Sequence, residues 1–498
     1  MPALHAHIIA EAAYMKDWEN YTCHEEPCTE ADLMQRAATA FVRKILSFNA
    51  HPLQWVVLAG PGNNGGDGFF IARLLLQEGY RPEIYFLPSL RKRPPHIEQC
   101  IVELIAAGLI VQEISDKKNF PLLSADTIVI DALFGVGLNR PLSSVAAELV
   151  MYLLAAEVNC WSVDIPSGMG SDQYINGPSV RAQHTIGFES LKPAFLLAQN
   201  WTMLGKLDVV PIGLSPNYPL IHPSDTGLIT EETIREIFRP RQGVEHKGHF
   251  GHSFLVAGSE GKMGAAVLAA KACLRSGTGL LTVLVPEKYT VELLTALPEA
   301  MQLARENGLP KLEPYRSIGI GPGMGLDADA EKLLVDVLRK SQVPLVLDAD
   351  ALHLLSLHPE HLSLLPEGTL LTPHPKEFDR LFGKHSNEYE RSAKARQVSQ
   401  QNPWVVILKG HHTQVCYEGK SWFNSTGNAG LAKGGSGDVL TGILTALLAQ
   451  QYDPLQAALL GVYLHGLAAD IAVNTIAEES LLASDVIDSL GKAFQTLY

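Results

Sequence analysis

The sequence predicts an α/β protein built from two three-layer domains, and three observations carry this prediction. Short apolar runs alternate with amphipathic helical segments along the chain. Many of these runs are hydrophobic along their whole length, as in strands of a parallel sheet covered by helices on both faces. The alternation pauses once, at GLSPNYPLIHPSDTG (213–227), where proline, serine and asparagine cluster as they do at domain boundaries.

Composition narrows the class of protein. The 498 residues exceed the usual size of one domain, and 46% hydrophobic with 18% charged residues allow a large core. A formal charge of -14 argues against nucleic-acid and anionic-membrane partners, which favour basic surfaces. The six cysteines form no CxxC pair, the N-terminus lacks the pattern of a signal peptide, and no uninterrupted apolar run reaches membrane-spanning length. We therefore expect a cytoplasmic protein.

The elements of the first domain follow in order. A helix is expected over TEADLMQRAATAFVRKIL, with Thr29 as its N-cap. Strands and helices then alternate, with strands at 53–60, 81–88, 127–135 and 160–168 and helices at 67–80, 94–109 and 143–157. A second α/β series occupies 252–259, 264–277, 279–286, 316–325, 344–352, 368–375 and 404–419, and helices from GDVLTGILTALLAQ (437–450) onward close the chain.

The loop AGPGNNGGDGFF (59–70) joins an expected strand to an expected helix. Its glycines let the backbone approach a ligand, and the N–H groups at a helix start favour an anion. Asn63, Asn64 and Asp67 add oxygens suited to a hydroxyl, an amide or a hard cation. The loop has neither GxGxxG spacing nor a Walker lysine. The alternative is a tight turn in which Asp67 caps the helix.

Two further polar loops follow neighbouring strands. Asp131 ends the strand in VIDALFGVGLNRP, and Asp164 and Ser167 follow the strand in VDIPSG. Ligands of open α/β sheets bind beyond the carboxyl ends of the strands. A single aspartate there is commonly a cap, but three such loops predict that Asn64, Asp67, Asp131, Asp164 and Ser167 converge on a site.

The second half carries another glycine loop, KGGSGDVLTG (433–442). Gly434, Gly435 and Gly437 leave N–H groups free to hold a transferring phosphoryl group, and Asp438 at the helix start is placed to act as a base toward a hydroxyl.

Three other expected strand ends supply further candidates. Lys409 and Thr413 in ILKGHHT are placed to contact a nucleotide, and Gly323 and His374 lie in GIGPGMG and TPHPKEF. By itself, His374 fits a buried, hydrogen-bonded histidine better than a ligand.

These motifs resemble a known family. PGNNGGDG, DALFGVG and VDIPSG resemble the NAD(P)H-hydrate epimerase domain. HKGHFGH, GAAVLAAKACLRSGTGLLTV, GPGMG, DADAL, TPHPKEF, LKGHHT and GNAGLAKGGSGDVLTG resemble the NAD(P)H-hydrate dehydratase domain. The resemblance covers nearly the whole chain, in the order of the bacterial bifunctional repair enzyme. It implies a Rossmann-like domain over 1–218 and a ribokinase-like domain over 226–498.

The resemblance also implies an activity. NADH and NADPH take up water to form R and S hydrates (NADHX and NADPHX). The first domain would interconvert the epimers, and the second would dehydrate the S form at the expense of ADP, giving AMP and phosphate. Potassium ion, magnesium ion and a homo-oligomeric state are expected with it.

The family's residues map onto both domains. In the first, the hydrate would be held by Asn63, Asn64, Gly65, Gly66 and Asp67, by Gly135, Val136, Gly137, Leu138, Asn139, Arg140 and Pro141, and by Asp164, while Asn64, Asp131 and Ser167 would bind K⁺. In the second, the hydrate would contact Ala265, Gly323, His374 and Asp438, and the nucleotide would contact Lys409, Gly410, His411, His412, Thr413 and Gly437. Asp438 and Asp164 are the expected catalytic residues.

Two other functions compete. A ribokinase-type kinase, using ATP on a small alcohol, shares the second fold and its glycine loop but leaves the first domain unexplained. A non-catalytic nucleotide sensor would not need Asp131, Asp164 and Asp438 together. The segment CHEEPCTEADLMQRA departs from the family pattern, which leaves contacts on the entry side of the first domain open.

Overall fold

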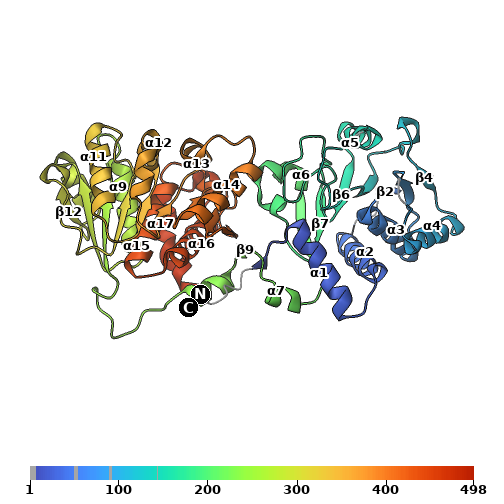
Figure 1. Cartoon of the computed structure of the whole chain (residues 1–498), viewed down its shortest axis with the longest axis horizontal. Helices are drawn as coiled ribbons and strands as arrows, with labels where there is room; N and C mark the ends of the chain where they lie inside the picture. Colours follow the sequence, from blue (N-terminus) through green and yellow to red (C-terminus); the bar gives the residue numbers. More distant parts are fainter. Residues whose placement is uncertain (1–6, 50–53, 89–91, 143) are drawn as a thin grey trace. The chain divides into compact units, whose positions relative to one another are not determined.

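The computed structural model describes residues 7–49, 54–88, 92–142 and 144–498. They fall into two compact units, Ile8–Ser224 and Asp225–Tyr498, with His7 assigned to the second (Figure 1). The boundary lies inside the proline-rich segment 213–227.

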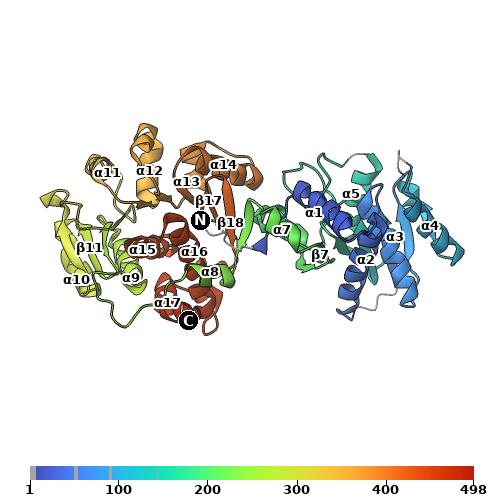
Figure 2. The same cartoon turned by 60° about the horizontal axis from the view of Figure 1, so that its bottom comes forward.

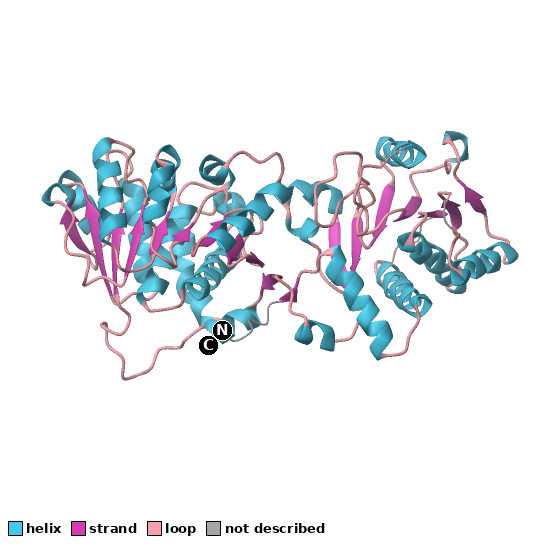
Figure 3. Ribbon diagram, viewed as in Figure 1, coloured by secondary structure: helices cyan, strands magenta, loops and turns pink. Residues whose placement is uncertain are grey.

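The first unit is built on a seven-stranded, wholly parallel sheet in the order β4-β3-β2-β5-β6-β7-β8 (Figure 3). Its strands are β2 (Gln54–Ala59), β3 (Glu83–Phe86), β4 (Val111–Glu113), β5 (Thr127–Ala132), β6 (Asn159–Val163), β7 (His184–Phe188) and β8 (Lys206–Val210). Its helices are α1 (Ala12–Glu25), α2 (Glu30–Leu46), α3 (Asn63–Gln77), α4 (Pro95–Ala106), α5 (Ser144–Ala156), α6 (Trp201–Leu204) and α7 (Asn217–Ile221), with 3₁₀ turns η1 (Lys117–Asn119), η2 (Pro193–Leu196) and η3 (Ala198–Asn200).

Strand β2 shows why this sheet is covered on both faces. Alternate side chains of a strand point to opposite faces. Trp55 and Val57 pack in the core formed with α1 to α4, whereas Val56 and Leu58 pack in the core formed with α5. The expected three-layer arrangement is confirmed.

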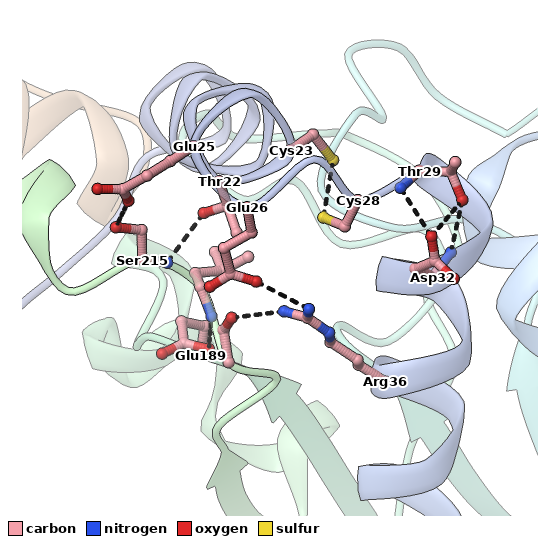
Figure 4. Close-up of polar contacts among 12 residues, drawn as sticks. Thr22, Cys23, Glu25, Glu26, Cys28, Thr29, Asp32, Arg36, Glu189 and Ser215 are labelled. Carbon is pink, nitrogen blue, oxygen red and sulfur yellow. Dashed lines mark hydrogen bonds and ion pairs between the residues drawn. The ribbon is translucent and has the colours of Figure 1, made fainter.

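Helix α2 begins where its sequence predicts. The Thr29 side chain accepts a hydrogen bond from Asp32 N (3.2 Å), and Asp32 Oδ2 accepts one from Thr29 N (2.8 Å), which completes a capping box (Figure 4).

Helix α3 differs from the expectation. We expected it to start at Asp67, but it starts at Asn63, so Asn63 to Asp67 form its first turns rather than a loop. The first turn of α3 needs glycine because its backbone passes very close to the residue that follows β2. A Cβ atom on Gly65 would stand 1.9 Å from the carbonyl oxygen of Gly60.

The proline-rich segment is not a free linker. Ser215 accepts a hydrogen bond from Trp18 Nε1 (2.7 Å) on its carbonyl, and its N–H donates to Thr22 Oγ1 (2.9 Å). Its hydroxyl donates a hydrogen bond to Glu25. Arg36 donates hydrogen bonds to both Gly213 O (2.9 Å) and Glu26 Oε2 (2.8 Å) (Figure 4). This segment therefore fixes α1 and α2 within the first unit.

The second sheet has eleven strands in the order β1-β9-β18-β17-β16-β15-β14-β13-β10-β11-β12. They are β1 (His7–Ile8), β9 (Thr226–Ile229), β10 (His252–Val256), β11 (Leu280–Val285), β12 (Met301–Ala304), β13 (Ser317–Ile320), β14 (Leu345–Leu347), β15 (Leu370–Leu371), β16 (Val405–Leu408), β17 (Gln414–Tyr417) and β18 (Lys420–Asn424). The central pairs from β12 to β16 are parallel, but β17 pairs antiparallel with both β16 and β18. The expected single run 404–419 is thus a hairpin of two strands.

Helices cover this sheet, and α15 packs along α9 (Figure 2). The helices are α8 (Glu231–Ile237), α9 (Met263–Arg275), α10 (Thr290–Ala296), α11 (Ala328–Lys340), α12 (Ala349–Leu357), α13 (Pro375–Phe382), α14 (Glu388–Gln401), α15 (Ser436–Ala449), α16 (Pro454–Ala472) and α17 (Ala483–Gln495), with 3₁₀ turns η4 (Glu287–Tyr289), η5 (Arg305–Asn307), η6 (Pro359–Leu364), η7 (Ala429–Leu431) and η8 (Glu478–Ser480).

Helix α16 is long and apolar enough to cross a membrane. Its side chains instead fill the core of this unit, including Leu459, Leu460 and Leu464, and 72% of its most apolar window is buried. Its hydropathy is accounted for by that packing.

Candidate active sites

The first candidate site is built around Asp131 at the end of β5. Its carboxylate is fully buried and accepts hydrogen bonds from Ser162 Oγ (2.9 Å), Ser167 N (2.9 Å) and Ser167 Oγ (2.6 Å). Burial raises the pKa of Asp131, and these hydrogen bonds oppose the rise. Within the described chain no cationic side chain pairs with Asp131, so this buried carboxyl group has hydrogen bonds but no counter-charge.

Asn64 faces the same region from the start of α3. It is 9% exposed, and its Nδ2 atom is buried with no hydrogen-bond partner. A Cβ atom on Gly135 would lie 3.3 Å from its side chain, so the predicted segments 63–67 and 135–141 meet here. The two ends of an amide are assigned from their hydrogen bonds, and turning this one over would present its oxygen at the unpaired position.

The predicted potassium ligands fit a hard cation. Asn64, Asp131 and Ser167 offer amide, carboxylate and hydroxyl oxygens, which suit such an ion. A bound cation would also compensate the buried charge of Asp131.

The remaining segment, residues 135–141, follows β5 as a turn in which Leu138 N donates to Gly135 O (3.2 Å). Gly137, Asn139, Arg140 and Pro141 are exposed, and Val136 and Leu138 are partly buried. Gly135 of this loop lies against Asn64, and Arg140 is among its exposed residues.

Asp164 lies just beyond β6 with a φ of 66°, an uncommon conformation for a residue other than glycine. Its Oδ1 accepts hydrogen bonds from Lys192 Nζ (2.5 Å) and Phe188 N (3.0 Å). Lys192 is 1% exposed and also donates to Phe188 O (2.8 Å). Strained backbone and a buried ion pair at a strand end are typical of functional sites.

Sequence reasoning did not find the acidic neighbour Glu19 or the role of Lys192. Burial, followed by the charge of Asp164, raises the pKa of Glu19 on α1 to about 7, although Lys192 lowers it. Burial also raises the pKa of Asp67 well above its usual value, with added repulsion from Asp164 and Glu19. No local motif marks Glu19, because only the packing of α1 brings it near these groups.

The second candidate site lies at the start of α15. Gly435 has a φ of 96° and acts as the N-cap without a side-chain hydrogen bond, so no side chain caps the first N–H groups of this helix. Burial raises the pKa of Asp438 to about 6, and the nearby carboxylate of Asp348 adds to the rise while Lys409 opposes it.

Asp348 is the centre of this site, although sequence reasoning did not select it. It is 2% exposed at the end of β14, where Oδ1 accepts from Lys409 Nζ (2.7 Å) and Oδ2 accepts from Thr441 Oγ1 (3.0 Å). Burial raises the pKa of Asp348, but Lys409 and the hydrogen bonds outweigh burial, so its net shift is downward. A Cβ atom on Gly437 would lie 3.1 Å from Asp348 Oδ2 and 3.4 Å from Lys409 Nζ, which places the glycine loop directly over this ion pair.

His374 is a helix cap rather than a buried histidine. Its Nδ1 accepts from Lys376 N (3.1 Å) and Glu377 N (3.4 Å), and its side chain is 45% exposed. Burial and then the charge of Lys409 lower its pKa, which favours the neutral imidazole. Its Nε2 atom lies 3.4 Å from Glu377 Oε1.

Ala265 and Gly323 lie side by side, since a Cβ atom on Gly323 would stand 3.2 Å from that of Ala265. Asp350 fixes this loop by accepting hydrogen bonds from Gly325 N (3.0 Å) and Lys262 Nζ (3.0 Å).

Lys409 to Thr413 form the β16–β17 connection, where His412 Nδ1 bonds Asn424 O (2.9 Å) and Gly410 is exposed. His465 on α16 also lies near Lys409 and the start of α15, and burial lowers its pKa to about 4.

With this geometry in place, the class of protein follows from comparison with known families. Residues 30–194 match the family model for the YjeF-related protein N-terminus, and residues 253–492 match the model for NAD(P)H-hydrate dehydratase. The two matches lie in the two units described above.

Full-length relatives then identify the family. The chain is 31% identical to the bifunctional NAD(P)H-hydrate repair enzyme Nnr of Thermofilum pendens, covering 98% of this chain and 96% of that protein. It is 33% identical to the enzyme of the same name from Escherichia coli, covering 92% and 88%. The chain belongs to the family of bifunctional NAD(P)H-hydrate repair enzymes.

A solved structure supports the fold of the second unit. A ribokinase-like superfamily protein from Enterococcus faecalis is 30% identical over 55% of this chain and 97% of its own, with a TM-score of 0.51. The expected ribokinase-like fold is confirmed.

Proposed function

We propose that the chain repairs hydrated nicotinamide cofactors in two steps. The unit Ile8–Ser224 interconverts the R and S hydrates of NADH and NADPH. The unit Asp225–Tyr498 dehydrates the S hydrate at the expense of ADP and releases AMP and phosphate. The second activity is supported above all by the position of Asp438. Burial raises the pKa of this carboxyl group to about 6, and it follows the glycine loop that lies over the Asp348–Lys409 ion pair.

Dehydration requires a better leaving group than hydroxide. Ionised Asp438 would take the proton of the ring hydroxyl, whose oxygen then attacks the terminal phosphoryl group of ADP and displaces AMP. The open N–H groups before α15 would stabilise the charge that develops on this phosphoryl group, with Lys409 beside them. The phosphate ester bond to the ring then breaks, helped by the ring nitrogen lone pair, and phosphate leaves. Loss of a proton from the neighbouring ring carbon then restores the ring double bond and gives the reduced nicotinamide.

Magnesium would supply charge neutralisation to the phosphates of the nucleotide. Both carboxylate oxygens of Asp348 are engaged, by Lys409 and Thr441, whereas Glu377 offers a second carboxylate 3.9 Å from Lys409 Nζ that could hold the ion.

Epimerisation requires loss of the ring hydroxyl and return of water to the other face. Asp164 is held by Lys192, so its role is to activate the returning water, while Glu19, protonated in part at neutral pH, would protonate the departing hydroxyl. Potassium held by Asn64, Asp131 and Ser167 would compensate the buried carboxylate and fix the segments 63–67 and 135–141 that hold the hydrate.

One assay tests both activities. Purified protein is incubated with mixed R and S NADH hydrates, ADP, MgCl₂ and KCl, and the absorbance of reduced nicotinamide is followed. Full recovery of both epimers is expected. Recovery that stops at the S fraction, apart from slow spontaneous epimerisation, would remove the first activity from the proposal. No recovery with ADP or with ATP would overturn the proposal as a whole.

The competing kinase function predicts a different product. A stable phosphorylated alcohol formed with ATP would favour it, whereas ADP-dependent loss of water excludes it. A cytoplasmic location and a homo-oligomeric state stay predictions, the second of which size-exclusion chromatography with light scattering would test.

A further inference from the structure

Three side chains able to bind a metal ion meet at the C-terminal end of α12. Asp348 lies at the other end of the same helix, as its N-cap. Glu331 lies in the first turn of α11, His358 caps the C-terminus of α12, and His361 lies in η6. Their donor atoms all lie within 4.8 Å of one another. In the described part of the chain no other group of three such residues converges in this way.

The local fold explains the convergence. The N–H of His361 donates to the carbonyl of His358 (3.0 Å), and the resulting turn brings the two rings into a stack with centroids 5.5 Å apart. Helix α11 packs against η6 and runs beside α12 in both views (Figures 1 and 2), so the first turn of α11 meets this pair.

The spacing of the donors fits a tetrahedral ion. Glu331 Oε1 is 3.4 Å from His358 Nε2 and 3.6 Å from His361 Nε2. Ligands about 2.0–2.2 Å from a tetrahedral zinc ion lie roughly 3.3–3.6 Å apart. Two of the three separations already match.

A fourth residue supplies the support that metal-bound histidines usually have. Glu360 Oε1 lies 3.6 Å from His358 Nδ1, the ring nitrogen opposite the one that faces Glu331. A carboxylate at this position fixes the orientation of a metal-binding imidazole and increases its basicity.

We propose that Glu331, His358 and His361 bind one divalent transition-metal ion of the zinc class, with water in the fourth position and Glu360 orienting His358. Two imidazoles and a carboxylate favour Zn²⁺ or Co²⁺ over Mg²⁺, which prefers oxygen ligands. The site is therefore separate from the magnesium of the nucleotide reaction. It would join the first turn of α11 to the end of α12.

The test uses the full chain after chelator treatment, titrated with ZnCl₂ by calorimetry and with CoCl₂ by visible absorption. We expect one ion per chain at this site and the intense bands of tetrahedral Co²⁺. Glu331→Gln, His358→Gln and His361→Gln should each weaken Zn²⁺ binding at least 100-fold. Glu360→Gln removes only the supporting carboxylate and should weaken it 10- to 100-fold.

A matched control uses the other close histidine pair. His246 and His249 have ring centroids 4.0 Å apart but no third ligand beside them in the described residues. The double variant His246→Gln/His249→Gln should keep the Co²⁺ bands and the Zn²⁺ affinity. Circular dichroism and dehydratase activity without added zinc show whether each variant folds.

Two results would overturn the proposal. One is a wild-type chain that binds no Zn²⁺ at micromolar concentration. The other is binding that survives in folded His358→Gln and His361→Gln variants but disappears in the control double variant.

Discussion

The dehydratase should lose activity in acid because of one carboxyl group. Asp438 must be ionised to act as a base, and burial together with the Asp348 carboxylate raises its pKa to about 6. We expect kcat to rise with pH through about 6 and then level. Asp438→Asn keeps the shape of the side chain but removes the base, so it should lower kcat by roughly 10²- to 10⁴-fold and abolish this rise.

The structure sets the size of the pH effect. With a pKa of about 6, the ionised fraction falls from about 90% at pH 7 to about 10% at pH 5, so kcat should fall about tenfold. Asp348→Asn removes a neighbouring negative charge and should shift the whole rise to lower pH.

Stability should change in the opposite direction to activity. The pKa of Asp438 is higher in the folded chain than in the unfolded one, so the folded state holds this proton more tightly and stability falls as pH rises from about 4 to 6. A shift of about two units corresponds to up to about 3 kcal/mol. Asp438→Asn should therefore stabilise the second unit at pH 7.5 while inactivating it.

The assay follows ADP-dependent recovery of NADH from pure S hydrate between pH 5 and 8, with saturating substrates and constant ionic strength. Urea unfolding at pH 7.5 provides the second readout. A kcat that does not change across this range in the wild type, or an Asp438→Asn variant that keeps more than a tenth of it, would refute Asp438 as the base.

Three other predictions concern the first unit. Glu19→Gln should slow epimerisation about 10²-fold or more. It should also remove the loss of activity that the wild type shows as pH rises through about 7, because Glu19 must be protonated to act as an acid. A wild-type pH profile in the variant would exclude this role. Ser167→Ala should raise the K⁺ concentration for half-maximal epimerase activity more than tenfold, since the hydroxyl is a proposed ion ligand and a hydrogen-bond partner of Asp131. Unchanged K⁺ dependence, measured against Na⁺ at equal ionic strength, would contradict the assignment. Gly65→Ala should destabilise the unit by about 1–3 kcal/mol in urea unfolding, because its Cβ would overlap Gly60 O. Gly137→Ala is the control, because its Cβ would meet no atom within 4 Å.

Local sequence was enough to predict much of the fold. The apolar run at 53–60 and the capping pair Thr29 and Asp32 act within a few residues, so the strand β2 and the start of α2 lie where the pattern places them. The extent of α3 was not predictable in this way. Glycines and asparagines usually mark a loop, and here packing against β2 makes them the first helical turns.

The sequence by itself determined which chemical groups stand at the strand ends, because strand, polar loop and helix succeed one another locally. Asp131 and Asp164 were found in this way, and Asp438 was found from its place at the start of a helix after a glycine loop. Only the tertiary structure decided their charge environment. Lys192 and Glu19 are brought to Asp164 by η2 and α1, and Asp348 meets Lys409 across 61 residues of chain. Burial and charge pairing set a pKa. Both depend on contacts between segments that lie far apart in the sequence, and no fixed spacing in the sequence marks those contacts.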